Sequence, residues 1–299
     1  MKKSLFLAAV AATLLGSCST DGEAPTQPDG TARTPIIFTG NVTNDARAAG
    51  TAWEKDDAIG IYMLATGTTD IAEEAENRKY TTPAADGKFT PAEASQAVYF
   101  PVDESVKVDF IAYYPHTAPL ADNIYKVDVS VQTSPAAIDL LRSDKVAVKD
   151  KTTSGVDLTF IHRLSRVEVN VIAGTGFTDA DLQGLGITLS KQLTKADYKV
   201  LTDELTPVTG SGDKEISLLL DGTAASAIIL PQDGTAGRVL TFNMKSNPTF
   251  TYSIPADKTF LSGKKTIYNI TLALTGVEVT TTIEPWGIQG TINDDADIQ

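Results

Sequence analysis

The sequence predicts an all-β protein built from two antiparallel β-sandwich domains in tandem. Apolar and polar residues alternate in many short segments, and such alternation indicates strands with one buried face. Turn dipeptides of the Asp-Gly type separate several of these segments, at 86–87, 221–222 and 233–234. Little of the chain shows a helical period. The clearest alternating segments are 106–110, 127–131, 167–171, 240–244 and 268–274.

The remaining organisation follows from breaks in this pattern. A polar stretch at 149–155 divides the alternating region about midway, so we predict one sandwich over 35–152 and a second over 153–299. Each part has the usual size of a single sandwich. The only segments that could form short helices are 71–78, 135–142 and 179–185.

Composition excludes several classes of protein. The 299 residues include 25 Lys and Arg against 38 Asp and Glu, which gives a formal net charge of −13. This acidic balance disfavours a nucleic-acid partner and a polybasic membrane surface. With 1 Cys and 2 His, the chain cannot build thiolate zinc sites or a disulfide framework. We therefore predict no cofactor and no metal site.

The N-terminus has the pattern of an export signal. Two lysines precede an apolar run that ends at Leu15, and this run is too short to span a bilayer as a helix. The following Gly16-Ser17-Cys18 completes a sequence that resembles the lipobox of bacterial lipoproteins. That resemblance implies a signal peptide over 1–17 and lipidation of Cys18 as the first mature residue. The alternative is a spare cysteine beside an ordinary cleavage site. Residues 18–34, almost free of apolar side chains, are predicted to form a flexible tether or propeptide.

No motif indicates catalysis. His116 and His162 have no neighbouring cysteine, second histidine or nucleophile motif, so we interpret both as structural or surface residues. The acidic clusters lack the spacing of a calcium loop. Trp53 and Trp286 lie at the margins of expected strands, where packing in the core is the favoured interpretation. The sequence thus predicts that the protein is not an enzyme.

An ordered set of short segments resembles the fimbrillin family of Bacteroidales, the lipoprotein-derived subunits of type V pili. Each segment alone is weak, but together they run in the same order over nearly the whole chain. After the lipobox they are Ile36-Ile37-Phe38, Asp45-Ala46-Arg47-Ala48, Trp53, 56–62, 98–101, 108–115, 158–165, 229–232, 263–268 and 283–286.

The resemblance implies a fold and a mode of assembly. The family's fold is two transthyretin-like β-sandwiches, and its members are exported as lipoproteins to the outer membrane and cell surface. In members that polymerise, a trypsin-like protease cuts after an arginine near the first strand and removes that strand. A strand from another fimbrial subunit then fills the groove, which is a form of β-augmentation. Because the contact is head-to-tail, it generates a filament.

For the cut, we predict cleavage between Arg47 and Ala48, which follow the expected first strand 36–42. The alternative is Arg33, after which the first strand would be retained. For the donor strand, the candidates are 277–283 and the tail 287–299, with Pro285 interrupting them. The first segment could equally be the last strand of the second sandwich. By composition the tail is acidic and poor in apolar residues, which makes it a mediocre donor.

The function that this resemblance implies is that of a structural subunit of a cell-surface fimbria supporting adhesion, with other fimbrial subunits as partners. Host or bacterial surface molecules could also bind it. Three alternatives stay open. The first is an anchor or tip subunit, and the second is a surface glycan-binding lipoprotein that uses exposed aromatic residues. The third and most distant is a secreted hydrolase.

Overall fold

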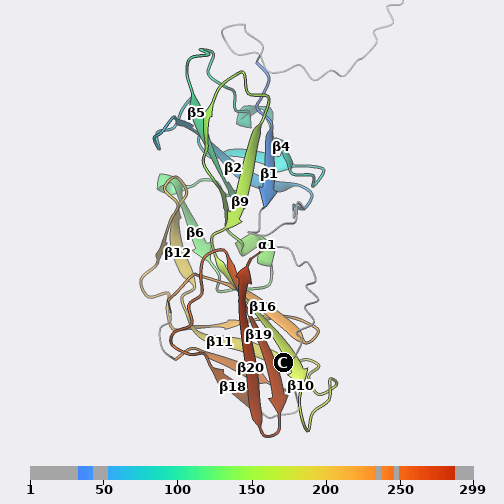
Figure 1. The fold of residues 1–299 in the computed structure, drawn as a ribbon. Coiled ribbons are helices and arrows are strands. Elements are labelled where there is room, and N and C mark those ends of the chain that lie inside the picture. The colour runs from blue at the N-terminus through green and yellow to red at the C-terminus, as the bar shows by residue number, and fades with distance from the viewer. Residues whose placement is uncertain (1–32, 43–52, 234–236, 246–248, 287–299) are drawn as a thin grey trace, which may run out of the picture. The chain divides into compact units, whose positions relative to one another are not determined.

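The structure, a computed structural model, describes residues 33–42, 53–233, 237–245 and 249–286. Contacts divide the chain into two units, 1–34 and 35–299, and the first is described only at Arg33 and Thr34. Strands dominate the described residues of the second unit, which confirms the all-β prediction (Figure 1). No helix among the described residues is long or apolar enough to cross a membrane.

The first sheet closes on itself. Following the pairings from β2 through β3, β4, β1, β9, β7 and β5 leads back to β2, and β8 pairs with β5 outside this ring. Antiparallel pairs form most of the ring, but β1 and β9 run parallel. The strands are β1 (Phe38–Val42), β2 (Asp57–Ala65), β3 (Arg78–Thr82), β4 (Lys88–Pro91), β5 (Val108–Tyr114), β7 (Leu141–Ser143), β8 (Val146–Lys149) and β9 (Val156–His162).

Alternation along these strands produces the core of the ring. In β9, Val156, Leu158 and Phe160 are fully buried, whereas Asp157 between the first two is exposed. Side chains of opposite parity point to opposite faces, so every second residue reaches the interior. Strand β5 is buried along its whole length because its second face packs against another apolar cluster. The buried aromatic residues inside the ring are Phe38, Trp53, Tyr80, Phe89, Phe110, Tyr114 and Phe160.

Two further sheets share a second apolar core. A five-stranded sheet has the order β15-β16-β10-β19-β20, and a four-stranded sheet has the order β14-β11-β17-β18. Their inward residues belong to one cluster, in which Tyr252 of β18 contacts Tyr268 of β19. The strands are β10 (Ser165–Ala173), β11 (Gly186–Gln192), β14 (Lys214–Ser217), β15 (Leu219–Asp221), β16 (Ala224–Ile229), β17 (Val239–Asn243), β18 (Thr249–Ser253), β19 (Lys264–Ala273) and β20 (Gly276–Pro285).

The pairings cross the boundary that the sequence predicts near residue 152. Strand β9 lies beyond this position and joins the first sheet through β1 and β7. Strand β6 (Ile124–Asp128) lies before it and pairs with β12 (Lys195–Lys199), to which β13 (Glu204–Pro207) is added. Alternation identifies a strand but not its partner, so a polar break in the sequence need not coincide with a change of sheet.

Helical structure is scarcer than the sequence predicts. The segment 135–142 contains one helical turn, α1 (Pro135–Ile138), and short 3₁₀ turns occur at Ala94–Gln96 and Ala121–Asn123. The predictions for 71–78 and 179–185 are wrong. In the first segment Glu73, Glu74 and Asn77 have positive φ angles of 49°, 55° and 47°, which no right-handed helix contains. The second forms turns.

Candidate functional site

The residues predicted for processing fall outside the described part of the chain. Cys18, Arg47, Ala48 and the tail 287–299 all lie outside the described residues. What the structure describes are the elements on either side of the predicted cut, namely β1 before it and Trp53 after it. The candidate functional site is therefore the place that β1 occupies in the first sheet, which we call the β1 slot.

Backbone hydrogen bonds hold β1 on both sides. Along β9, five residue pairs run in parallel register from Phe38 opposite Val156 to Val42 opposite Phe160. Along β4, only Phe38 and Thr39 have partners, and the Gly40 N–H donates to the Gly87 carbonyl over 2.7 Å. Figure 1 shows β1 in blue between β4 and β9. Strand β1 is thus the element that connects β4 to β9 within the ring.

The inward face of β1 completes the apolar core of the ring. Phe38 is fully buried and makes edge contacts with Tyr80 and Phe110, with ring centroids 5.1 and 5.3 Å apart. Ile36, just before the strand, is 5% exposed, and its N–H donates to the Val98 carbonyl. Edge contacts between aromatic rings are favourable beyond their buried area. Strand β1 therefore contributes large side chains to the core as well as ladder hydrogen bonds.

Between these large residues, Gly40 lies where no side chain fits. A Cβ atom at this position would be 2.8 Å from Cε2 of Phe89 and 3.1 Å from Cε2 of Phe160. The Trp53 indole N–H donates to the Gly40 carbonyl over 2.7 Å. Sequence reasoning did not single out Gly40 or the two phenylalanines. The available signal was a glycine in the middle of an apolar strand, which often marks a close approach of another group.

The slot without β1 would be an open sheet edge above an apolar groove. One edge of β9, the Val98 and Gly87 carbonyls and the Trp53 indole N–H would lose their partners. The buried faces of Tyr80 and Phe110 would reach solvent. Unpaired strand edges and exposed apolar surface are both unfavourable, so such a slot favours the addition of another strand.

Of the two candidate donor segments, the structure describes only 277–283. Residues 277–283 belong to β20, which pairs with β19 along its whole length, so this segment is the last described strand of its sheet. Directly after it, the Trp286 ring stacks on His162 of β9 with centroids 4.0 Å apart and an interplanar angle of 8°. His162 also pairs through Nδ1 with Asp139 Oδ1 at 2.9 Å. The tail therefore begins beside the end of β9.

Both tryptophans are core residues, as the sequence predicts. Trp53 is 6% exposed and packs edge-on against Phe89, Tyr114 and Phe160. Trp286 is 5% exposed. Within the described residues, no cluster of His, Cys, Asp or Glu has the arrangement of a metal site.

We expect His116 to make the stability of the fold depend on pH. Its ring stacks on Tyr113, and burial lowers the pKa of its imidazole below the usual value. In the unfolded chain this imidazole titrates near a pKa of about 6.5, so the unfolded state binds more protons as the pH falls through that value. We expect the urea midpoint to decrease between pH 7.5 and pH 5.5. A His116→Gln variant should show a smaller decrease, and an unchanged pH profile in that variant would contradict this assignment.

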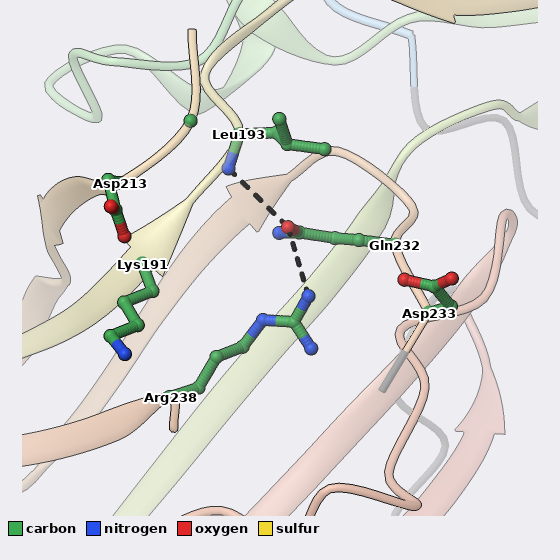
Figure 2. A pocket seen from close by; sticks show the side chains of 7 residues that line it. Lys191, Leu193, Asp213, Gln232, Asp233 and Arg238 are labelled. Carbon is green, nitrogen blue, oxygen red and sulfur yellow. Dashed lines mark hydrogen bonds between the residues drawn. The ribbon is translucent and has the colours of Figure 1, made fainter. Parts of the chain in front are cut away.

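A polar pocket of about 340 Å³ lies beside strands β11 and β17 of the four-stranded sheet (Figure 2). The Gln232 amide oxygen accepts hydrogen bonds from the Leu193 N–H and from Arg238 Nη2, at 3.4 and 3.1 Å. Burial lowers the pKa of the Arg238 guanidinium, which lies over the Phe260 ring. Two cationic and two acidic residues balance each other in the lining, which comprises Lys191, Leu193, Gly212, Asp213, Gln232, Asp233 and Arg238. We interpret the cluster as a structural cross-link between loops.

Comparison with known proteins gives a consistent result. Residues 46–286 match a protein family described as fimbrillin-like. Over 295 residues the chain is 44% identical to a Bacteroides uniformis protein named "Putative fimbrium subunit Fim1C", and the match covers 95% of each chain.

Two solved structures have the same fold. One is described as a "putative cell adhesion protein" from Bacteroides uniformis. It has a TM-score of 0.76 and 40% identity, and the match covers 88% of this chain and 100% of that one. The other, a cell adhesion protein of the same description from Bacteroides ovatus, has a TM-score of 0.73 and 22% identity, with 87% and 100% covered. The second likeness concerns the fold alone.

Proposed function

Because this chain belongs to the fimbrillin-like family, we propose that it is a structural subunit of a cell-surface fimbria that supports adhesion and assembles by donor-strand exchange. Membership also means that the protein is a fimbrial or adhesion protein and not an enzyme. In the proposed pathway, cleavage after Arg47 releases β1, and a strand from another fimbrial subunit enters the slot. Repeated head-to-tail, this step produces a filament.

The observation that carries this proposal is the position of β1 in the closed ring. Loss of β1 would interrupt the ring at one place, between β4 and β9. The rest of the ring keeps its own pairings, including β2 with β5 and β7 with β9. A single cut near the end of β1 would therefore open an acceptor site without removing another strand of the ring.

We further propose that the chain is exported as a lipoprotein through lipidation of Cys18 and reaches the outer membrane before the cut. Residues 18–47 would then form the anchored propeptide that cleavage removes. Two transthyretin-like sandwiches would make up the mature subunit. Because β9 pairs with β1, the first of them extends to His162 in this proposal.

The mature N-terminus tests the proposed function. Mass spectrometry should find chains that start at Ala48 in fimbriae sheared from cells, and chains that start at lipidated Cys18 in the outer membrane. A start at Cys18 in both fractions would contradict assembly by strand removal and favour the anchor subunit. A chain that starts at Ala48 but always lies at the end of a filament would favour the tip subunit.

The glycan-binding alternative finds less support in the described residues. A carbohydrate platform needs aromatic rings with an exposed face, and Trp53 and Trp286 are both buried. Retention of the processed protein on a polysaccharide column, without any filament formation, would restore that alternative.

A further inference from the structure

Strand β20 provides a long sheet edge. It pairs with β19 over all 10 of its residues, Gly276–Pro285, in a register without a bulge. Among the described residues no strand pairs with its other side, so β20 ends the five-stranded sheet (Figure 1). At the other edges of these two sheets, β15, β14 and β18 have only 3, 4 and 5 residues. A short edge strand disfavours the addition of another strand, whereas a long one favours it.

The hydrogen bonds of β19 indicate which backbone groups of β20 face the free side. The Leu272 carbonyl accepts from the N–H of Gly174, which follows β10, so even-numbered residues of β19 direct their backbone groups to β10 and odd-numbered residues to β20. Odd residues of β19 lie opposite even residues of β20, as in the pair Thr271 and Glu278. The odd residues of β20 therefore direct their N–H and C=O groups away from β19. These residues are Val277, Val279, Thr281 and Ile283.

The side chains of the same residues form the apolar face of the edge. Val277 and Val279 are half-buried against the second core, and Ile283 is 47% exposed. Native edge strands commonly avoid pairing through lysines, bulges or a proline within the strand. Strand β20 contains no lysine, and its proline, Pro285, is the last residue. The edge is therefore suited to pairing over Val277–Ile283.

A second copy of β20 fits this edge in one antiparallel register, with a two-fold axis at Thr280. Val277 then lies opposite Ile283 of the other copy, and Val279 lies opposite Thr281. Every outward backbone group of these residues is paired, because directly opposite residues of this kind exchange both of their hydrogen bonds. On the other face of the sheet, Thr280 lies opposite itself. The same surface thus serves both copies, as a two-fold interface requires.

Shifting the axis by one residue makes the pairing worse in either direction. With the axis at Thr281, Glu278 would lie opposite Glu284 of the other copy, and like charges in directly opposite positions are destabilising. With the axis at Val279, Ile283 would lie beyond the end of the other β20 and its backbone groups would stay unpaired. Charge and hydrogen bonding therefore favour the same register.

We propose that β20 is a self-association surface, through which the five-stranded sheets of two copies of this chain join edge to edge about Thr280. The pairing needs no cleavage, because the β1 slot lies in another sheet. A contact of one strand on one strand is smaller than a usual stable interface, so separate subunits associate weakly. A filament repeats the same edge along its length, and many weak contacts then act together. This last step, the lateral association of fimbriae, rests on the proposed function.

Disulfide trapping tests the register. The protein for this test is the chain 18–299 with Cys18→Ser, which contains every described residue and no thiol. In the proposed register, the two copies of Thr280 form a pair without hydrogen bonds, with Cα atoms about 4.5 Å apart, which suits a disulfide. The two copies of Thr282, which is exposed on the same face, are four residues out of register, or about 13 Å apart. Thr282→Cys is therefore the matched control for Thr280→Cys.

Under mild oxidation, we expect Thr280→Cys to form a disulfide-linked dimer at least about tenfold faster than Thr282→Cys. A mixture of Glu278→Cys and Thr282→Cys chains should form a mixed dimer faster than either variant links to itself, because these two residues lie opposite each other. Equal rates for Thr280→Cys and Thr282→Cys, or no dimer from Thr280→Cys, would each overturn the proposal. A mixed pair that links no faster than its components would overturn the register.

Charge substitutions at the same two positions test the pairing without a covalent bond. Thr280→Lys places two like charges opposite each other and should raise the dissociation constant of the dimer at least about threefold. Thr282→Lys places a lysine opposite Glu278 of the other copy and should lower that constant at least about threefold. Sedimentation equilibrium measures both, and circular dichroism checks that the exposed substitutions leave the fold intact. A change in the same direction in both variants would contradict the proposal.

These measurements use the uncut chain, so they are separate from the test of the proposed function. The N-terminus of natural fimbriae reports on the removal of β1, whereas dimer formation reports on the edge of β20. Failure of dimer formation with a start at Ala48 in fimbriae would reject the self-association surface alone. Dimer formation with a start at Cys18 in both fractions would keep that surface and reject assembly by strand removal.

Discussion

Replacing Arg47 by alanine should produce a subunit that folds and is exported but does not enter fimbriae. The physical reason is that β1 stays covalently attached and keeps its ladder with β9 and its hydrogen bond to Gly87. A donor strand cannot compete with a strand of the same chain, which has a far higher effective concentration. Filament yield, measured by electron microscopy of sheared material, should decrease at least a hundredfold, while the amount of subunit in the membrane is unchanged.

Arg33→Ala is the matched control for this experiment. Cleavage after Arg33 would leave β1 in the mature chain, so this variant should assemble normally if Arg47 is the processed residue. Normal filaments from Arg47→Ala would refute processing at that site. Loss of filaments from Arg33→Ala alone would indicate that the cut precedes β1 and that another mechanism joins the subunits.

Trp53→Ala should lower the free energy of unfolding of the uncut chain by about 3–5 kcal/mol. The indole contacts Phe89, Tyr114 and Phe160, with centroids 5.0, 5.5 and 5.2 Å away, and truncation leaves a cavity among these rings. Trp53→Phe retains much of this packing but loses the hydrogen bond to Gly40, which should cost about 1 kcal/mol. Urea unfolding monitored by circular dichroism measures both variants.

The control for the Trp53 variants is a substitution at Ile37, which directly precedes β1 and faces solvent. Ile37 is 49% exposed, so Ile37→Thr should change the free energy of unfolding by less than about 0.5 kcal/mol. A Trp53→Ala variant as stable as Ile37→Thr would show that the indole does not hold β1 in the ring.

The sequence is informative about which residues form strands and which face they bury. Alternation in 167–171 and 268–274 predicts β10 and β19, and both strands have their inward residues in the second core. It does not reveal that these two strands run parallel to each other. Direction and partner depend on how distant segments meet, and period two is the same for parallel and antiparallel pairs.

The prediction of secondary structure from sequence fails most clearly where the residue composition is typical of a helix. The segment 71–78 is rich in Glu and Ala, which favour helices, yet Ile71 forms a bridge with Leu64 and Ala72 donates to the Met63 carbonyl. Pairing with the edge of β2 outweighs helix propensity there. At Gly40 the sequence offers only the glycine itself as a signal of a close approach, and it does not identify the approaching groups, because Phe89 and Phe160 lie 49 and 120 residues further along the chain.

A ring of strands has a consequence for timing. In an open sheet two edges exist from the moment of folding, and each is a place where the wrong partner can add. In the closed ring of this protein β1 pairs with both β4 and β9, so in the proposed pathway these two edges become available only after a covalent bond is broken. In the proposed pathway, subunits on the way to the surface would therefore have no open β1 slot for another subunit to fill, and a protease at the destination would determine when and where filament growth begins.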